Sequence, residues 1–345
     1  MKKIIALAVS LVLLISFVGC DTHTGTSSNA NSENPFNSPT NQGNIVSLTD
    51  PLWYNKIKIN NFVSEWTSNV LETDDSFYFV AEDGVYRHNK GNGENHKLLS
   101  DKINGISLYG NDLYFCTDNV IKKVDIQTNT VSLVWEKSQL TEQVIFDKIG
   151  DFQIYNDYLY IFVNGVDVVR YSISNKTTEV YAEDCAWMIP SENGYYYIDH
   201  ASRTFSIYYK DDSANQSSLI RGDGITSSND DIQKQIYLSD LTRVGEKIYY
   251  YDRVNKDIYE LNTTGQDVLI FDGNEDGSVG IQCTSNSNVL YFYEHTDSYE
   301  KIYMYYGSAI FLLAQLDTGA NLFEVTDTEI FYKEINGDST IVNLY

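Results

Sequence analysis

The most regular pattern along the chain is a short polar turn followed by an apolar residue and an aromatic residue in a strand-like run. It occurs in seven segments. The first three are DDSFYF from residue 74, GNDLYF from residue 110 and NDYLYI from residue 156. The aligned aromatic residues are Tyr78, Tyr114, Tyr160, Tyr196, Tyr249, Tyr291 and Phe331. They lie 36, 46, 36, 53, 42 and 40 residues apart. Propeller blades repeat every 40–50 residues or so, and these intervals are close to that length.

Each repeated unit contains four short segments in which apolar and polar residues alternate. In the first unit these are NVLET, SFYFVA, VYRHN and HKLLS, separated by Asp, Asn and Gly residues that are typical of turns. A single sheet of this kind has two partly apolar faces and cannot bury them alone, whereas radial stacking of several sheets covers both. The sequence therefore predicts an all-β fold, a seven-bladed β-propeller.

The two ends of the repeated region complement each other. The last unit supplies only three strand-like segments, NLFEV, EIFYKE and IVNLY. The segment WYNKIKINNF at residues 53–62 precedes the first unit and also has a strand-like pattern. We expect it to close the ring as the fourth strand of the last blade, which would leave no free sheet edge at the seam. We also expect most of the aligned aromatic residues to pack between blades.

The N-terminal region has the pattern of an export signal. Lys2 and Lys3 precede a 16-residue apolar run at residues 4–19, which is shorter than the roughly 20 residues of a membrane-spanning helix. The run ends at Val18, Gly19 and Cys20, which resemble a bacterial lipobox, with Phe17 where Leu is usual. This resemblance implies a lipoprotein signal peptide at residues 1–19 and lipid attachment at Cys20.

The segment that follows is rich in Ser, Asn, Thr and Gly and has almost nothing to bury. Such a composition cannot offset the entropy of ordering, so residues 20–44 are predicted to be a lipid-anchored flexible spacer. Residues 45–345 are then the propeller. The expected location is the cell membrane, with the chain exposed on the extracytoplasmic face.

Composition narrows the functional classes. The formal net charge of −24 argues against nucleic acid and against anionic lipid surfaces, both of which attract Lys and Arg. Cys116, Cys185 and Cys283 are widely spaced and do not form a disulfide framework, although one pair remains open in an exported protein. We expect them to be small buried side chains in strands, and we expect the chain to be monomeric.

One segment resembles part of a calcium loop. Asp272, Asn274, Asp276 and Gly277 match the first half of the D-x-[DN]-x-[DN]-G pattern, in which alternate oxygens converge on one cation. The twelfth position of such a loop supplies a bidentate Glu, but Cys283 occupies it here. Calcium is therefore the one candidate cofactor, and an acidic turn between blades is the alternative. The Arg-Gly-Asp triplet at residues 221–223 is too short to indicate adhesion.

A family resemblance follows from these repeats. The segment IYYYDRVNKDIYELNTTGQ at residues 248–266 resembles the YWTD-type propeller repeat, and the segments at residues 195–209 and 290–306 resemble it more loosely. The chain is thus similar to YWTD-like β-propeller lipoproteins of Gram-positive bacteria, a family of unassigned function. YWTD propellers usually have six blades, so six blades is the alternative to the seven counted here. The shared residues are structural and imply no functional residues.

The sequence favours a binding or interaction module for a carbohydrate, a peptide or an envelope protein. The alternative is a carbohydrate-active enzyme, a glycoside hydrolase or lyase with carboxylates in the central funnel. No nucleophile elbow, phosphate-binding loop or zinc-binding helix motif is present, and 48 acidic residues do not single out a catalytic pair. Trp187 and Tyr195 are the aromatic residues considered for ligand contact, with core packing as the alternative.

Overall fold

The computed structural model describes most of the repeated region. The described residues are Tyr54, 67–140, 148–163, 167–183, 185–199, 204–214, 216–223, 237–273, 277–282, 289–317, 322–326, 328–333 and 339–343. All of them belong to one compact unit, residues 42–345. Among these residues no helix has the length and apolar character needed to span a bilayer.

The described strands form antiparallel sheets that follow one another along the chain. The first three sheets are β1 (Val70–Glu72), β2 (Ser76–Ala81), β3 (Gly84–Asn89) and β4 (Asn95–Leu99); β5 (Gly105–Tyr109), β6 (Asp112–Cys116), β7 (Val120–Asp125) and β8 (Thr130–Glu136); and β9 (Ile149–Tyr155), β10 (Tyr158–Val163), β11 (Asp167–Ser172) and β12 (Thr178–Ala182). A short 3-10 turn, Lys137–Gln139, follows β8. Each sheet is a meander in which consecutive strands pair, as the alternating pattern predicts.

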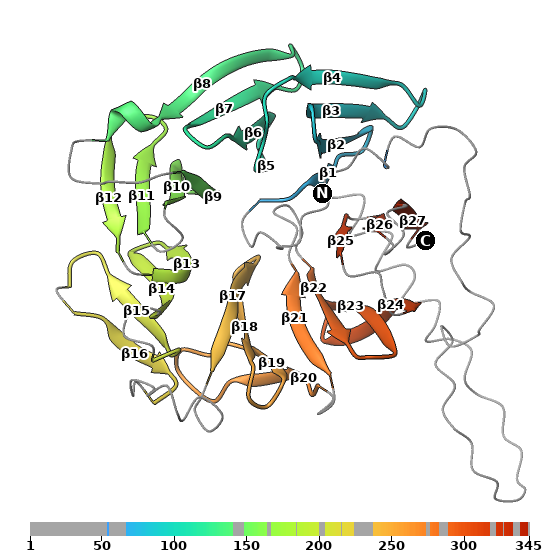
Figure 1. The fold of residues 1–345 in the computed structure, drawn as a ribbon. Coiled ribbons are helices and arrows are strands. Elements are labelled where there is room, and N and C mark those ends of the chain that lie inside the picture. The colour runs from blue at the N-terminus through green and yellow to red at the C-terminus, as the bar shows by residue number, and fades with distance from the viewer. Residues whose placement is uncertain are drawn as a thin grey trace, which may run out of the picture. The chain divides into compact units, whose positions relative to one another are not determined.

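The remaining sheets repeat this order. They are β13 (Cys185–Ser191), β14 (Gly194–Asp199), β15 (Ile207–Asp211) and β16 (Ser218–Arg221); β17 (Leu238–Val244), β18 (Lys247–Asp252), β19 (Asp257–Glu260) and β20 (Val268–Phe271); β21 (Ser278–Gln282), β22 (Leu290–His295), β23 (Tyr299–Tyr306) and β24 (Ala309–Asp317); and β25 (Leu322–Val325), β26 (Glu329–Lys333) and β27 (Ser339–Asn343). Figure 1 shows these sheets arranged around a centre, with β1, β5, β9, β13, β17, β21 and β25 nearest to it.

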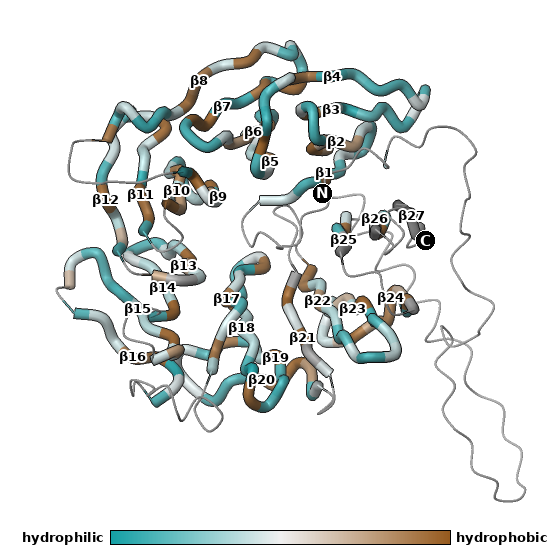
Figure 2. The backbone as a smooth tube through the Cα atoms, viewed as in Figure 1, coloured by the Kyte–Doolittle hydropathy of each residue, from teal (hydrophilic) through white to brown (hydrophobic). Residues whose placement is uncertain are grey.

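This arrangement confirms the predicted all-β propeller. Six of the described sheets have all four strands. Six complete blades are therefore described, which agrees with the six-bladed alternative. A seventh sheet, with three described strands, lies between the sixth sheet and the first. Figure 2 shows a hydrophobic stretch along β10, whereas the outer strand β4 is mostly hydrophilic.

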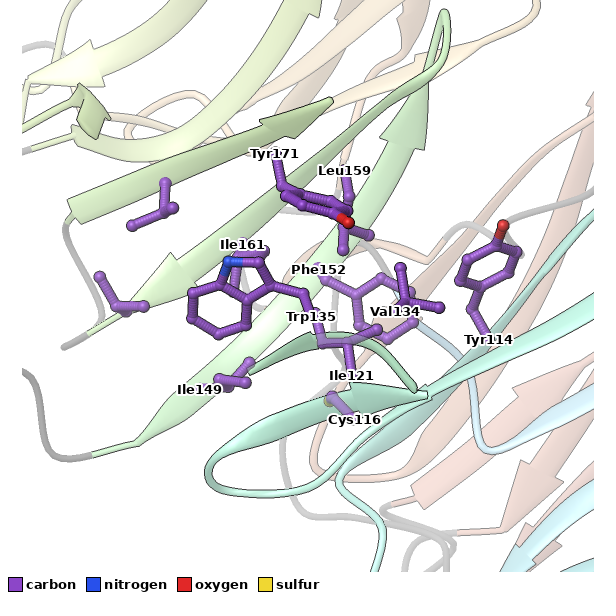
Figure 3. Close-up of a cluster of buried hydrophobic side chains, with 12 residues drawn as sticks. Tyr114, Cys116, Ile121, Val134, Trp135, Ile149, Phe152, Leu159, Ile161 and Tyr171 are labelled. Atoms are coloured by element: carbon purple, nitrogen blue, oxygen red, sulfur yellow. The ribbon is translucent and has the colours of Figure 1, made fainter. Parts of the chain in front are cut away.

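The hydrophobic core is divided into clusters that each join two neighbouring sheets. Figure 3 shows the cluster between the second and third sheets, where Trp135 of β8 packs among Cys116, Ile149 and Ile161. Each of the seven aligned aromatic residues belongs to, or packs against, a different cluster. The expectation that these residues fill the space between blades is therefore confirmed.

The last cluster closes the ring. Phe331 of β26 packs edge-on against Phe77 of β2, with ring centroids 5.7 Å apart, beside Val70 and Phe79. Tyr54 is the one described residue of the segment 53–62, and it is buried in this same cluster. The pairing of that segment as a closing strand lies outside the described residues and stays a prediction.

Candidate functional site

Equivalent positions on the innermost strands form a row around the centre of the ring. In each sheet the aligned aromatic residue of the second strand pairs with a residue of the innermost strand. The residue two positions before that partner on the innermost strand is therefore structurally equivalent from sheet to sheet. We call these positions the inner row; in the first six sheets they are Asn69, Gly105, Asp151, Trp187, Asp240 and Gly280.

Two neighbouring residues of the inner row are held in an unusual backbone conformation. Trp187 of β13 has φ 47° and Asp240 of β17 has φ 52°. Both sit where the register between the first and second strands shifts, so each belongs to a β-bulge. Bulges redirect a side chain, and a left-handed backbone at a non-glycine residue costs about 1–2 kcal/mol that the surrounding fold must offset. The two matching bulges thus aim an indole and a carboxylate from adjacent sheets.

The segment Thr67–Asn69, which leads into β1, occupies the inner row of the first three sheets. Ser68 forms two backbone hydrogen bonds of 2.9 Å with Ile106 of β5. Gly105 has no side chain at the point where Thr67 passes, and a Cβ there would lie 2.1 Å from the Thr67 hydroxyl. The Thr67 hydroxyl donates a 2.7 Å hydrogen bond to Asp151 of β9.

The same segment also contacts the last sheet. Ser68 Oγ donates to Glu324 Oε2 at 2.8 Å, and Asn69 Nδ2 donates to Glu324 Oε1 at 2.8 Å. Burial raises the pKa of Glu324, and the hydrogen bonds from Asn69 and Ser68 oppose that rise. Residues of this segment therefore contact the first, second, third and seventh sheets. Only a segment near the centre of the ring can do so.

In the fourth, fifth and sixth sheets the inner row consists of Trp187, Asp240 and Gly280. Trp187 is partly buried, and the Asp240 side chain is 18% exposed. In the sixth sheet Gly280 makes room for Tyr293 of β22, since a Cβ at Gly280 would lie 2.4 Å from the Tyr293 hydroxyl. We call Trp187, Asp240 and Tyr293 the central site.

Electrostatics set the central site apart from the surface carboxylates. Burial raises the pKa of Asp240 to about 6, and Arg253, whose Nη2 lies 4.0 Å from Asp240 Oδ1, opposes the rise. Burial raises the pKa of Tyr293 to about 12, and the negative charges of Asp240 and Glu300 add to it. Burial alone raises the pKa of Glu300 to about 7. Near neutral pH Asp240 of the central site and the neighbouring Glu300 can therefore gain or lose a proton.

The geometry allows recognition of an uncharged polar ligand. An indole offers a flat apolar face, and a carboxylate offers an acceptor for hydroxyl groups. Ligand sites in general combine aromatic walls with a few placed polar groups. Asp151 and Glu324 accept hydrogen bonds from Thr67, Ser68 and Asn69. Asp240 also has polar neighbours, Ser239 and Arg253.

The predicted site residues have different outcomes. Cys20, Asn274 and Asp276 lie outside the described residues; Asp272 directly follows β20. Within the described part of the chain no group of three or more His, Cys, Asp or Glu side chains is placed to hold a metal ion. The calcium loop and the lipid attachment therefore stay predictions.

The two aromatic residues singled out from the sequence lie in different places. Trp187 belongs to the central site, and it also packs against the hydrophobic cluster between the fourth and fifth sheets, as the packing alternative expects. Tyr195 is 8% exposed and packs between the third and fourth sheets, with its ring 5.0 Å from that of Tyr181, so the packing alternative holds for it. Sequence analysis missed Asp240 and Tyr293, although Asp240 stands at the same repeat position as Trp187 and alignment of the innermost strands would have found it.

The cysteines that are described match the expectation of buried strand residues. Cys116 ends β6 and Cys185 begins β13, and both are buried. Burial raises the pKa of the Cys116 thiol. Cys283 lies outside the described residues.

Arg221, the first residue of the Arg-Gly-Asp triplet, has a structural role. Arg221 donates through Nε and Nη2 to the two carboxylate oxygens of Asp267, at 2.5 and 2.6 Å, and also to the backbone oxygen of Gly265 at 2.7 Å. The Tyr250 hydroxyl donates to the same carboxylate at 2.7 Å. The Arg221 side chain thus joins the fourth and fifth sheets.

A polar hollow of 320 Å³ lies outside the ring centre, at the turn between β6 and β7. Asp118, Asn119 and the ion pair of Lys122 with Asp101, 2.7 Å long, line it. Its charges are partly neutralised by that pair, and it contains no aromatic residue.

Comparison with known proteins gives the fold alone. The chain matches no protein-family model and no curated protein sequence. Among solved structures it resembles PorZ, described as an essential surface component of the type-IX secretion system of Porphyromonas gingivalis. The TM-score is 0.52 at 13% identity, and the alignment covers 82% of this chain and 39% of PorZ.

Two further structures have the same likeness. Streptogramin B lyase has a TM-score of 0.52 at 10% identity, with 82% of this chain and 94% of the lyase covered. The extracellular domain of the two-component system protein BT4673 from B. thetaiotaomicron has a TM-score of 0.51 at 12% identity, with 83% and 39% covered. The chain is thus a β-propeller whose structural neighbours include an extracellular domain and a bacterial surface component.

Proposed function

We propose that this chain is an exported, membrane-anchored propeller that binds a carbohydrate, a peptide or an envelope protein at the central site. The observation that carries the proposal is the pair of matching bulges that present Trp187 and Asp240 from adjacent innermost strands. Strained backbone at equivalent positions is costly, and folds retain it most often where a side chain must be aimed. The structural similarity to a bacterial surface component and to an extracellular domain supports the proposed export of the chain.

The experiment is a pull-down of the purified chain with cell-wall polysaccharides and soluble glycans, with and without calcium. The wild-type chain should be retained by at least one glycan, and Trp187→Ala should lose that retention. Tyr306→Ala is the matched control, because Tyr306 is a 48% exposed aromatic residue on β23. Retention that survives in Trp187→Ala would place binding elsewhere. Absence of glycan retention would favour a peptide or protein ligand, which the same variants can test.

The anchor is tested separately. A chain lipidated at Cys20 partitions with membranes, because a buried acyl chain contributes about 0.8 kcal/mol per CH₂ group. Cys20→Ser should release the protein into the soluble fraction, whereas Cys116→Ser should not. Membrane association that is unchanged in Cys20→Ser would contradict the anchor.

A second candidate function is a carbohydrate-active enzyme. It is favoured by Asp240, a carboxyl group of the innermost strands whose pKa is raised by burial to about 6, in the range of a general acid. Incubation with polysaccharides should then release new reducing ends, and Asp240→Asn should abolish their release. Binding without any release of reducing ends leaves the binding module as the function.

A further inference from the structure

Arg243 is set apart from the other arginines that the structure describes. Arg87, Arg170, Arg221 and Arg253 each have a carboxylate within 4.0 Å. Arg243 has none among the described residues, in a chain with a formal net charge of −24. Its Nε is buried and has no hydrogen-bond partner among the described residues. A buried charged donor without an acceptor is costly, so the described residues leave this guanidinium incompletely paired.

The surroundings of Arg243 form a polar and aromatic corner at the ends of three innermost strands. Arg243 is next to the last residue of β17, and its Nη2 donates to the backbone oxygen of Pro190 near the end of β13 at 2.6 Å. Its guanidinium lies over the ring of Tyr155, the last residue of β9, at 4.8 Å from the centroid. Its charge also acts on the half-buried Tyr196 of β14. Arg243 therefore reaches from the fifth sheet to the fourth and the third.

This corner lies close to the central site. Arg243 follows Asp240 by three residues on β17, so their Cα atoms lie at most about 10 Å apart, the length of three extended residues. A ligand that contacts Trp187 and Asp240 can therefore extend to it. The inference made here rests on the proposed function and names the chemistry of the ligand.

We propose that Arg243, with Tyr155, binds a carboxylate group of the ligand. The planar guanidinium matches a carboxylate in shape and charge, and its cation–π contact with Tyr155 helps to hold it in place. Part of the Arg243 side chain remains exposed, so an anion can approach. The net charge of −24 repels polyanions. Physiological salt screens charges that lie more than about 8 Å away, so a single carboxylate can still reach a local positive charge. The ligand is thus a mostly neutral molecule with one carboxylate, not a polyanion.

The test uses small pairs of probes that differ in this one group. D-glucuronate is compared with D-glucose, and N-acetylalanine with its amide, by thermal shift and calorimetry at millimolar concentrations. The purified wild-type chain should bind a charged probe in a saturable manner and its uncharged partner at least about tenfold more weakly. The sugar pair and the alanine pair separate a sugar acid from a peptide carboxyl group as the source. Equal affinity within both pairs would overturn the proposal.

Variants then assign the effect to Arg243. Arg243→Met should weaken binding of the charged probe by about tenfold or more, and Arg243→Lys should have a smaller effect. Arg87→Met is the matched control, since it removes the same charge from an outer part of the first sheet and should leave binding unchanged. If Arg243→Met does not melt cooperatively, the variant is not folded and its binding is uninformative. The comparison of charged and uncharged probes on the wild-type chain then decides whether a carboxylate is bound. Equal glycan retention by wild type and Arg243→Met would overturn this inference and leave the proposed function standing. Loss of retention in Trp187→Ala but not in Arg243→Met would therefore support the proposed function alone.

Discussion

Ser68 and Glu324 lie 256 residues apart in the chain, yet the Ser68 hydroxyl donates a 2.8 Å hydrogen bond to the Glu324 carboxylate. Asn69 donates to the other oxygen of the same carboxylate, and Phe77 meets Phe331 in the adjacent cluster. Farther along the seam, the Thr328 hydroxyl donates to Glu72 at 2.6 Å. The first and last sheets are therefore joined by both polar and apolar contacts. A closed ring of this kind places the innermost strands of all sheets around one centre, where the central site lies.

Stability should fall as the pH rises toward neutrality, because of carboxyl groups like Glu300. Burial raises the pKa of Glu300 to about 7 from an ordinary value of 4.5, and the side chain is almost fully buried. The folded chain keeps this proton between these pH values while the unfolded chain releases it, so the free energy of unfolding decreases by about 2–3 kcal/mol across that range.

Urea unfolding at pH 4.5, 6 and 8 measures this effect. Glu300→Gln should be more stable than wild type at pH 8 and should show a shallower pH dependence. Glu82→Gln, at an exposed position, should follow the wild-type curve. A Glu300→Gln variant with the full wild-type pH dependence would contradict the raised pKa.

Trp135 should be among the residues most sensitive to truncation. Its indole is fully buried between the second and third sheets, and its Nε1 lies 3.3 Å from Thr178 Oγ1. Trp135→Ala should lower the free energy of unfolding by about 3–5 kcal/mol, since a large side chain is replaced by a cavity. Leu133→Ala on the same strand is the control, because Leu133 is 53% exposed and should change stability by less than about 1 kcal/mol. Equal losses would mean that this interface is not packed as described.

Arg221 should resist even a conservative replacement. Lys cannot reproduce the two parallel hydrogen bonds to Asp267, so Arg221→Lys should cost about 1–3 kcal/mol in chemical unfolding. Arg87→Lys is the comparison, because the partner of Arg87 is the exposed carboxylate of Asp75 and such pairs contribute about 1 kcal/mol or less. An Arg221→Lys variant as stable as wild type would show that the contact between the fourth and fifth sheets contributes little.

The repeat and its strands are predictable from the sequence because their signals are local. The segment SFYFVA is β2, and HKLLS overlaps all of β4 but its first residue, Asn95. The aligned aromatic residues lie in the space between sheets as expected. Alternation with period two and turn residues at fixed offsets act within a few residues, so single-sequence patterns contain them.

The central site is less predictable because it depends on contacts between distant segments. Ser68 and Glu324 have no local pattern that pairs them, and Asp240 becomes a site residue through a bulge that shifts the register with Tyr249. Arg243 reads in sequence as one more surface charge, and only its contacts with Pro190 and Tyr155 set it apart. Trp187 was singled out by residue type, not by position.

The most direct test of the account is a double-mutant cycle across the seam, measured by urea unfolding of wild type, Ser68→Ala, Glu324→Ala and the double variant. Contacting residues in one hydrogen-bond network couple by about 0.5–3 kcal/mol. The closed ring predicts a coupling energy in that range, and a cycle of Ser68→Ala with Glu294→Ala, a buried carboxylate of the sixth sheet, should give about zero. A coupling energy near zero between Ser68 and Glu324 would contradict closure and the central site that depends on it.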